Sequence, residues 1–358
     1  MKICVYAIAK NEEKFVDRWI HSMREADCIC VLDTGSTDAT VELLADRGVI
    51  VKQDIVEPWR FDVARNRSMD LIPKDADICV CTDLDEIFRP GWRKLLEEAW
   101  TEGTEQLRYT YIWNFNERGM PGTTFLYEKI HAPGVFRWEH PVHEVLRRTD
   151  GKTGWKQAEA PGIVLEHHPD HAKSRAGYLE LLELSVREAP GDDRNAHYLG
   201  REYMFWGRWD DAIRQLKAHL AMPSAVWEPE RCASMRFLSR CCLAKGDGRE
   251  AMRWALRAIA EAPETREPWV QAQEVAYAME AWEDVAYYGG KALLIEEKSG
   301  TYINEEKAWG AYPWDAMAYA MYKMGEPSRA AEATIHALEI DPDNQRLKNN
   351  LAFYWEET

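Results

Sequence analysis

Long apolar runs are missing from this sequence of 358 residues. No window offers the roughly 18 uninterrupted apolar residues that a membrane-spanning helix needs. The opening stretch MKICVYAIAKNEE has too short an apolar run, and charges that come too early, for a secretory signal peptide. We therefore expect no transmembrane segment and a cytoplasmic location.

Positive charge is also scarce. The chain has 45 Lys and Arg against 61 Asp and Glu, which gives a formal net charge of -16. Binding to a nucleic-acid backbone requires clustered basic side chains, so we expect no nucleic-acid partner. Small phosphate compounds remain open as ligands, because a few local donors are enough to bind them.

The eight cysteines form no CxxC spacing, so they do not indicate a zinc or redox site. Two pairs, Cys28/Cys30 and Cys79/Cys81, are spaced by two on expected strands. This spacing places both side chains of a pair on one face of the strand, as small apolar filler. Unpaired, buried cysteines are typical of a reducing, cytoplasmic environment.

The two halves of the chain follow different patterns. Up to about residue 170, strand-like stretches such as ICVYAIA, CICVLD and DICVC alternate with helix-like stretches such as EEKFVDRWIHSM. Alternation of this kind predicts an α/β fold with a mainly parallel sheet. From there on the pattern is helical throughout. We therefore predict an α/β domain at residues 1–172 and an all-α domain at residues 173–358.

The helical half contains a degenerate repeat. The stretch NAHYLGREYMFWGRWDDAIRQLKAHLAMP has small residues at Gly200, Gly207 and Ala212, followed by Pro223. These positions match the tetratricopeptide pattern, in which small side chains let antiparallel helices approach closely. Similar spacing returns further along the chain, and NQRLKNNLAFYWEE is expected to cap the array. We predict a short solenoid that grips a partner, supports a homodimer, or does both.

Polar side chains gather where the expected strands of the first half end. The three groups are Lys10-Asn11-Glu12, Asp33 to Asp38, and Asp83 to Glu86. In a parallel α/β sheet the carboxyl ends of the strands meet at one edge, where ligands bind. We therefore expect the three groups to line one crevice.

The third group poses a problem of charge. Asp83, Asp85 and Glu86 make one another harder to ionise unless a positive charge lies among them. A divalent cation would supply that charge, and hard oxygen ligands suit Mg²⁺ or Mn²⁺. Because Mg²⁺ sites fill their remaining positions with substrate phosphates, the pattern predicts a diphosphate ligand. An ordinary acidic surface loop is the alternative.

Four motifs occur in order along the first half: AKNEE, VLDTGSTDAT, FDVARNRSMD and TDLDEIF. Over residues 1–170 they resemble the successive signatures of family 2 glycosyltransferases with the GT-A fold. With its repeat half the chain is similar to bacterial and phage members of that family, including peptide S-/O-glycosyltransferases such as the sublancin-modifying enzyme. The resemblance implies a metal-dependent, inverting enzyme that moves a sugar, glucose or a relative, from a UDP-sugar to a peptide or protein.

The resemblance also implies donor-binding residues. The end of the first strand and the Asp33 turn would hold the uridine, Arg65 would face the diphosphate, and Asp62 would orient the sugar or nucleotide. The full implied set is Asn11, Glu12, Asp33, Asp62, Arg65 and Asp83. This chain has Thr34 where many relatives have a second Asp beside the base.

The implied metal ligands are Asp83, Asp85 and His167, with Mn²⁺ or Mg²⁺ as the cation. His168 is the alternative to His167, because strand alternation lets only one of them face inward. A zinc site that combines them with His171 is a weaker option. Inverting transfer needs a carboxylate base behind the acceptor. Glu144, in FRWEHPVHEVL, is the implied base, and Glu86 and His143 are its rivals. The structural alternative is that His143 and Glu144 form a hydrogen-bonded pair that shapes the pocket.

Two other functions stay open at this point. One is a glycosyltransferase of lipid-linked or surface saccharide synthesis, with the repeats used for dimerisation. The other is an inactive GT-A scaffold whose repeat domain binds a peptide. The Asp-x-Asp motif disfavours the inactive scaffold, because such a protein has no need of a metal site.

Overall fold

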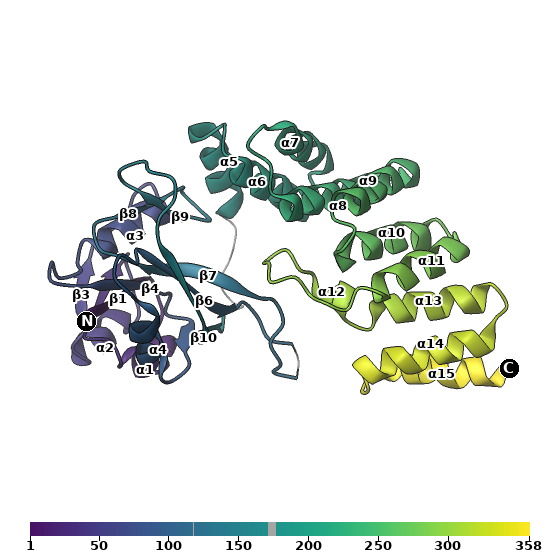
Figure 1. Ribbon diagram of the computed structural model, residues 1–358, viewed down its shortest axis with the longest axis horizontal. Helices are drawn as coiled ribbons and strands as arrows, with labels where there is room; N and C mark the ends of the chain where they lie inside the picture. Colours follow the sequence, from purple (N-terminus) through teal and green to yellow (C-terminus); the bar gives the residue numbers. More distant parts are fainter. Residues whose placement is uncertain (117, 171–176) are drawn as a thin grey trace. The chain divides into compact units, whose positions relative to one another are not determined.

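The computed structural model describes residues 1–116, 118–170 and 177–358. They divide into two compact units, Met1–Ser185 and Val186–Thr358 (Figure 1). The domain boundary predicted between residues 172 and 173 lies outside the described residues, as does His171. No helix within the described ranges is long and apolar enough to cross a bilayer.

The first unit is an α/β domain built on one mixed sheet. Eight strands join this sheet in the described part of the chain, in the order β3-β2-β1-β4-β7-β6-β10-β5. They are β1 (Ile3–Ala9), β2 (Cys28–Asp33), β3 (Ile50–Gln53), β4 (Ile78–Cys81), β5 (Glu86–Phe88), β6 (Gln106–Ile112), β7 (Thr124–His131) and β10 (Gln157–His167). A separate antiparallel pair is formed by β8 (Phe136–Glu139) and β9 (Val145–Arg148).

The predicted parallel region occupies one side of the sheet. Strands β3, β2, β1 and β4 are mutually parallel, as the alternation of strands and helices predicts. Strands β7 and β5 run antiparallel to their neighbours, so the sheet is more mixed than the pattern indicates. The reason is that β6 and β7 follow each other without a crossover helix, and adjacent strands joined by a loop run in opposite directions.

Helices of the first unit cover the sheet with their apolar faces. They are α1 (Glu13–Met23), α2 (Thr40–Asp46), α3 (Phe61–Met69) and α4 (Trp92–Ala99), and α5 (Tyr178–Glu188) follows the sheet. In α1 the helical spacing of Phe15, Trp19 and Met23 places all three in the core, together with Val5 and Val80 of the central strands. The predicted α/β class is therefore confirmed. The loops that carry the predicted site residues follow the carboxyl ends of β1, β2 and β4.

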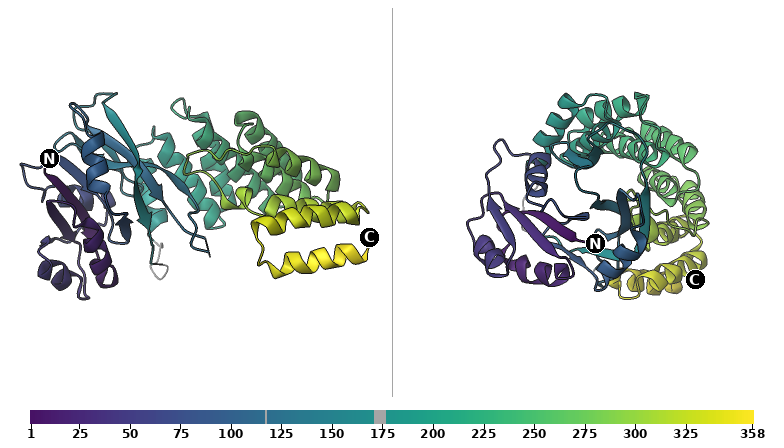
Figure 2. Two further views of the ribbon diagram at one scale, coloured as in Figure 1. Left: turned by 60° about the horizontal axis from the view of Figure 1, so that its bottom comes forward. Right: turned by 60° about the vertical axis from the view of Figure 1, so that its left-hand side comes forward.

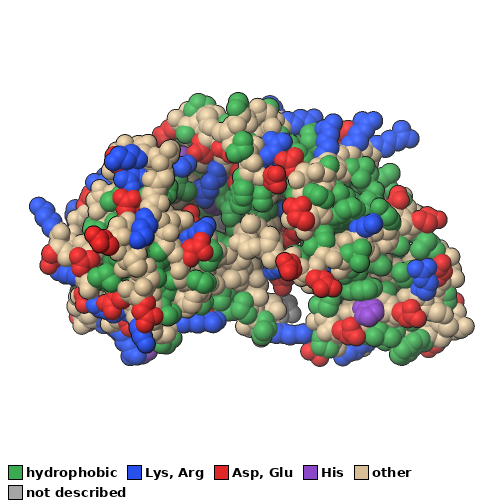
Figure 3. Space-filling model, in the orientation of Figure 1, with side chains coloured by type: hydrophobic (Ala, Val, Ile, Leu, Met, Phe, Trp, Pro, Cys, Tyr) green, Lys and Arg blue, Asp and Glu red, His purple; other side chains and the backbone are tan. Residues whose placement is uncertain are grey.

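The second unit is all-α, as predicted. Its helices are α6 (Asp193–Phe205), α7 (Trp209–Ala221), α8 (Glu228–Ala244), α9 (Gly248–Glu261), α10 (Arg266–Ala278), α11 (Trp282–Leu293), α12 (Glu306–Trp309), α13 (Tyr312–Lys323), α14 (Pro327–Ile340) and α15 (Gln345–Glu356). Apart from the short α12, each helix packs against the next along the chain, which gives a stack of helix pairs ending in α15 (Figure 2). Acidic and basic side chains both occur over this unit on the face seen in Figure 3.

Small residues set the spacing of these pairs. A Cβ atom added to Gly200 in α6 would lie 2.6 Å from the side chain of Leu216 in α7. Contacts between real Cβ atoms and their neighbours are longer than this, so α6 and α7 approach each other more closely than any larger residue at this position would allow. The glycine that the repeat pattern singled out therefore has a packing role.

One feature of the second unit is absent from the repeat pattern. The connection between α11 and α13 contains α12 and lies against the first helices of earlier pairs (Figure 1). Tyr302 donates a hydrogen bond to Glu230 in α8 at 2.8 Å. Glu305 forms ion pairs with Arg236 and Arg240 of the same helix. The connection is therefore anchored to α8 by a hydrogen bond and by partly buried ion pairs.

Candidate active site

The ends of β1 and β2 form one hydrogen-bonded corner. The backbone N–H of Asn11 donates to Ser36 Oγ at 2.9 Å, and that of Thr37 donates to Asn11 Oδ1 at 2.8 Å. Asn11 has φ of 55°, in the left-handed region that Asn tolerates better than most residues. Asp33 is fully buried and accepts backbone N–H bonds from Gly35 and Ser36, both at 3.1 Å. The predicted group at Lys10-Asn11-Glu12 and the group from Asp33 to Asp38 therefore lie together.

Two further predicted site residues, Glu12 and Asp62, are held in place by hydrogen bonds. The backbone N–H of Glu12 donates to Thr40 Oγ1 at 2.8 Å, which ties the end of β1 to the start of α2. Asp62, in the first turn of α3, accepts a two-pronged bond from Arg60 at 2.8 and 3.0 Å. An arginine fork of this kind fixes the carboxylate in one orientation.

Arg65 links two of the predicted acidic residues. Its guanidinium contacts Asp83 through Nη1 at 2.9 Å and Nη2 at 3.1 Å, while Nε donates to Glu144 Oε1. The Arg65 side chain is almost fully buried, and the face of Trp138 lies 5.4 Å away. Through these contacts the Arg65 guanidinium positions the carboxylates of Asp83 and Glu144.

A second buried cation, Lys129, lies on the other side of the acidic group. Its Nζ is 3.0 Å from Glu86 Oε1 and 3.3 Å from Asp83 Oδ2. Burial opposes the charge of Lys129, but the carboxylates of Glu86 and Asp83 outweigh burial and raise its pKa well above the usual value. For Asp83 burial favours the neutral acid, yet Arg65 and Lys129 lower its pKa well below the usual range. The protein itself therefore neutralises part of the acidic group.

Glu86, the rival base, is enclosed by donors. Oε1 accepts from Tyr111 at 2.7 Å and from Lys129 at 3.0 Å, and Oε2 accepts from the backbone N–H of Asp83 at 2.8 Å. Its residue surface is only 1% exposed. Both oxygens are thus used in holding the turn after β4, and this arrangement favours Glu144 over Glu86 as the group that faces an acceptor.

Asp85 has a different environment from its two acidic neighbours. Its Oδ2 lies 3.4 Å from His167 Nε2, at the last residue of β10. The other ring nitrogen of His167 contacts the backbone carbonyl of Trp113 at 2.9 Å and must donate to it, which directs Nε2 toward Asp85. Burial lowers the pKa of His167, but the hydrogen bond to Asp85 outweighs burial and raises it.

His168 points elsewhere, as strand alternation requires. Its Nε2 lies 3.2 Å from Glu166, and its ring stacks on Phe115 at 5.1 Å. Only its backbone contacts the acidic group, through an N–H bond to the Asp85 carbonyl at 2.8 Å. The preference for His167 over His168 stays a prediction, and the observed contacts favour it.

Glu144 lies in a strained segment between β8 and β9. The backbone is in the left-handed region at His140, with φ of 81°, and at His143, with φ of 51°. Such conformations are costly for residues other than glycine and often occur at functional sites. Arg65 engages one oxygen of Glu144, Oε1, and the other oxygen lies outside that ion pair.

The residue that the motifs do not reveal is Lys129. It lies in the strand TFLYEKIH, next to Glu128 and after the aromatic and apolar stretch FLY. A charged residue inside a central strand is rarely fully buried unless it is paired, so this position could have been flagged from the sequence. Its partners could not, because β7 reaches β4 only through the sheet topology.

Comparison with known proteins gives the class of the first unit. Residues 4–146 match the family model described as glycosyl transferase family 2. The chain carries a glycosyltransferase domain. The matched range includes every predicted site residue except His167, and it extends from β1 to β9.

Some solved structures are similar to this chain over about half of its length. A thermophilic TPR protein from Thermus thermophilus is 19% identical, with a TM-score of 0.38, over 50% of this chain and 90% of that one. A MamA protein from Desulfovibrio magneticus is 13% identical, with a TM-score of 0.39, over 48% and 87%. No curated protein sequence gives a significant match.

Proposed function

We propose that this glycosyltransferase moves a sugar from a UDP-sugar to a peptide or protein, with inversion at the anomeric carbon and with the help of Mn²⁺ or Mg²⁺. The observation that carries the proposal is the Asp85–His167 pair at the carboxyl ends of β4 and β10. A carboxylate and a ring nitrogen whose second nitrogen is fixed by a backbone carbonyl form a suitable pair of protein ligands.

The residues fit a divalent cation. With Nδ1–H donated to Trp113, a neutral His167 directs a lone pair at the Asp85 carboxylate, an arrangement that only a proton or a cation relieves. When bound, the cation supplies a Lewis acid for the departing diphosphate. Asp83 is already paired with Arg65 and Lys129, which supports a role at the ribose or at a metal-bound water rather than as a main ligand.

The transfer step also needs a base. Glu144 would take the proton of the acceptor hydroxyl or thiol while that oxygen or sulfur forms a bond to the anomeric carbon and the bond to UDP breaks. Arg65 holds Oε1 of Glu144, so the carboxylate has a fixed orientation when the acceptor arrives. Asn11, Glu12, Asp33 and Asp62 would surround the donor, since the first three lie at the same edge of the sheet.

The proposed acceptor is a peptide or protein, and the division of the chain into two units supports it. A peptide or protein is favoured because chemistry requires only the first unit, whereas the second exposes large aromatic side chains such as Phe205 and Trp206. The net charge of -16 favours a neutral or basic acceptor segment.

The test is a calorimetric titration of the full chain with UDP. We expect affinity to be strong with Mn²⁺, to fall sharply in EDTA, and to recover when Mn²⁺ is restored, because carboxylates and diphosphate repel each other without a cation. His167→Gln should lose the metal dependence, whereas the matched variant His168→Gln should keep it. Equal UDP affinity with and without the metal would refute the metal site.

A further inference from the structure

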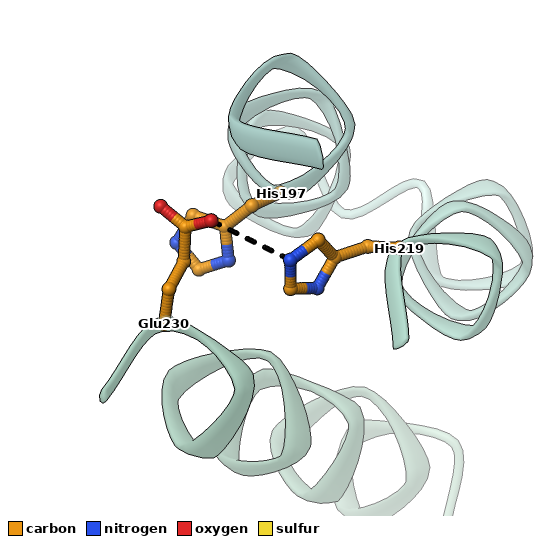
Figure 4. Close-up of side chains that lie close together, drawn as sticks. All are labelled: His197, His219 and Glu230. Carbon is orange, nitrogen blue, oxygen red and sulfur yellow. Dashed lines mark ion pairs between the residues drawn. The ribbon is translucent and has the colours of Figure 1, made fainter. Parts of the chain in front are cut away.

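A second group of metal-binding side chain types lies inside the helical unit, separate from the residues assigned above. His197 comes from α6, His219 from α7 and Glu230 from α8 (Figure 4). All three are buried, with exposed fractions of 1%, 0% and 3%. None belongs to the tetratricopeptide pattern, so the repeat does not account for them.

The separations suit a small cation. One ligand atom from each residue lies within 4.8 Å of the other two, and His219 Nε2 is 3.4 Å from Glu230 Oε1. In a tetrahedral zinc site with bonds of about 2.0–2.1 Å, two ligand atoms lie roughly 3.4 Å apart. The His219–Glu230 edge already has this length, and the ligand atom of His197 lies within 4.8 Å of both other ligand atoms.

Further side chains hold the ligands in place. Ser234 Oγ bridges the two histidines, at 2.7 Å from Nδ1 of His197 and 2.9 Å from Nδ1 of His219. Tyr302 donates to the second oxygen of Glu230 at 2.8 Å. Hydrogen bonds of this kind, made to the atoms that do not bind the metal, orient the ligands in known metal sites.

One atom of the group is left without a hydrogen bond. His219 Nε2 is buried, and among the described residues it has no hydrogen-bond partner. Its nearest acidic atom, on Glu230, is at 3.4 Å, and an unsatisfied buried polar atom costs about 1–3 kcal/mol. A cation between the two groups would remove that cost.

The charge state also suits metal binding. An imidazole binds a metal in its neutral form, and the burial of His197 disfavours a charged ring. Arg236, which also lies near His197, is paired with Glu305. Two imidazoles and one carboxylate bind zinc with a fourth position left for a water, and they are less suited to Mg²⁺, which prefers oxygen ligands.

We propose that His197, His219 and Glu230 bind one zinc-type divalent cation. Its chemical role is structural, because it joins three successive helices, α6, α7 and α8, through side chains buried in the stack. The site is independent of the Asp85–His167 pair and takes a softer cation than that pair does.

The experiment uses the full chain carrying His167→Gln, so that the transferase site does not contribute. After chelator treatment the protein is titrated with Zn²⁺ alone, and bound zinc is counted by elemental analysis. We expect one equivalent and a rise in the thermal midpoint. His336→Gln, which removes an exposed histidine of α14, is the matched control and should behave in the same way.

Three variants test the ligands. His219→Gln and Glu230→Gln should lose the bound equivalent and the thermal shift while keeping the far-ultraviolet circular dichroism of the parent. Ser234→Ala keeps all three ligands and should weaken zinc binding by about 10-fold to 100-fold. The proposal is contradicted if the folded parent binds no zinc, or if the His219→Gln and Glu230→Gln variants still bind one equivalent. Either result would mean that the three side chains form a hydrogen-bonded network only.

Discussion

At the scale of the residue, three neighbouring carboxylates have three different partners. Asp83 is paired with Arg65 and Lys129, Glu86 with Lys129 and a tyrosine, and Asp85 with His167. The like charges are tolerated because two buried cations from α3 and β7 lie among them. Asp85 lies opposite His167, so under the proposed function this position binds the metal, while Asp83 and Glu86 hold the turn.

Lys129→Met tests the buried part of this network. The substitution leaves Glu86 buried opposite an apolar side chain, and the loss of one partner of a buried ion pair costs about 3–5 kcal/mol. We expect the thermal midpoint of the first unit to fall markedly. Lys94→Met, at an exposed lysine of α4, is the control and should change the midpoint little. Equal midpoints for the two variants would argue against the network.

Glu144→Gln tests the base. We expect transfer to be abolished while UDP affinity and fold are kept, since a base acts on the acceptor and not on the nucleotide. Arg65 retains its two contacts with Asp83 in this variant. The measurements are transfer rate and calorimetric UDP binding. Normal transfer by Glu144→Gln, with none by a folded Glu86→Gln, would exchange the two roles.

At the scale of the element, the connection between α11 and α13 departs most from a regular repeat. Glu305 lies between Arg236 and Arg240 of α8. Burial opposes its charge, but the two guanidinium groups outweigh burial and lower the pKa of Glu305 to about 2, from a reference value of 4.5. The ion pairs therefore stabilise the folded state above pH 4.5, and this contribution is lost as the pH falls toward 2.

Glu305→Gln should show that pH dependence. At neutral pH we expect the variant to lose about 2 kcal/mol, less than a fully buried pair would, because the Glu305 side chain is 26% exposed. Between pH 4.5 and 2 the wild-type chain protonates the same group, so the difference between the two proteins should shrink. Thermal unfolding at a series of pH values measures it, and a difference that stays constant would contradict the assignment.

Gly200→Ala tests the packing of the first helix pair. The new Cβ would lie 2.6 Å from the Leu216 side chain and 3.3 Å from its backbone nitrogen, so the helices must move apart at a cost of about 1–3 kcal/mol. Gly290 in α11 has no atom within 4 Å of the same position. Gly290→Ala is therefore the matched control, and by removing a helical glycine it should stabilise the unit by about 0.5–1 kcal/mol. Destabilisation of equal size in both variants would rule out a specific packing role.

At the scale of the whole molecule, the chain combines a glycosyltransferase domain with a helical stack of similar length. If the stack selects the acceptor, a fragment of residues 1–185 should retain slow donor hydrolysis but lose turnover of the native acceptor, because only remote binding is removed. Circular dichroism must first show that the fragment is folded. Undiminished kcat/KM for the acceptor would show that the second unit has another task, such as dimerisation.

The sequence by itself determines much of this protein, because local signals repeat at fixed spacing. The strand ICVYAIA matches β1 residue for residue, and the α/β and all-α halves follow from hydrophobic periodicity. Asp33 and Asp85 could be named because they lie at or soon after the ends of expected strands, and His167 because the family resemblance implies a late histidine ligand. A parallel sheet brings such ends to one edge, whatever the details of its packing.

Only the tertiary structure decided which charges are paired. Arg65 meets Glu144 across 79 positions of the chain, and Lys129 meets Glu86 across 43. His197, His219 and Glu230 come together only because α6, α7 and α8 pack side by side. The energy of an ion pair or a metal site depends on the distance between the groups and on their burial. A periodic pattern along one segment does not predict the distance from that segment to another one far away in the sequence.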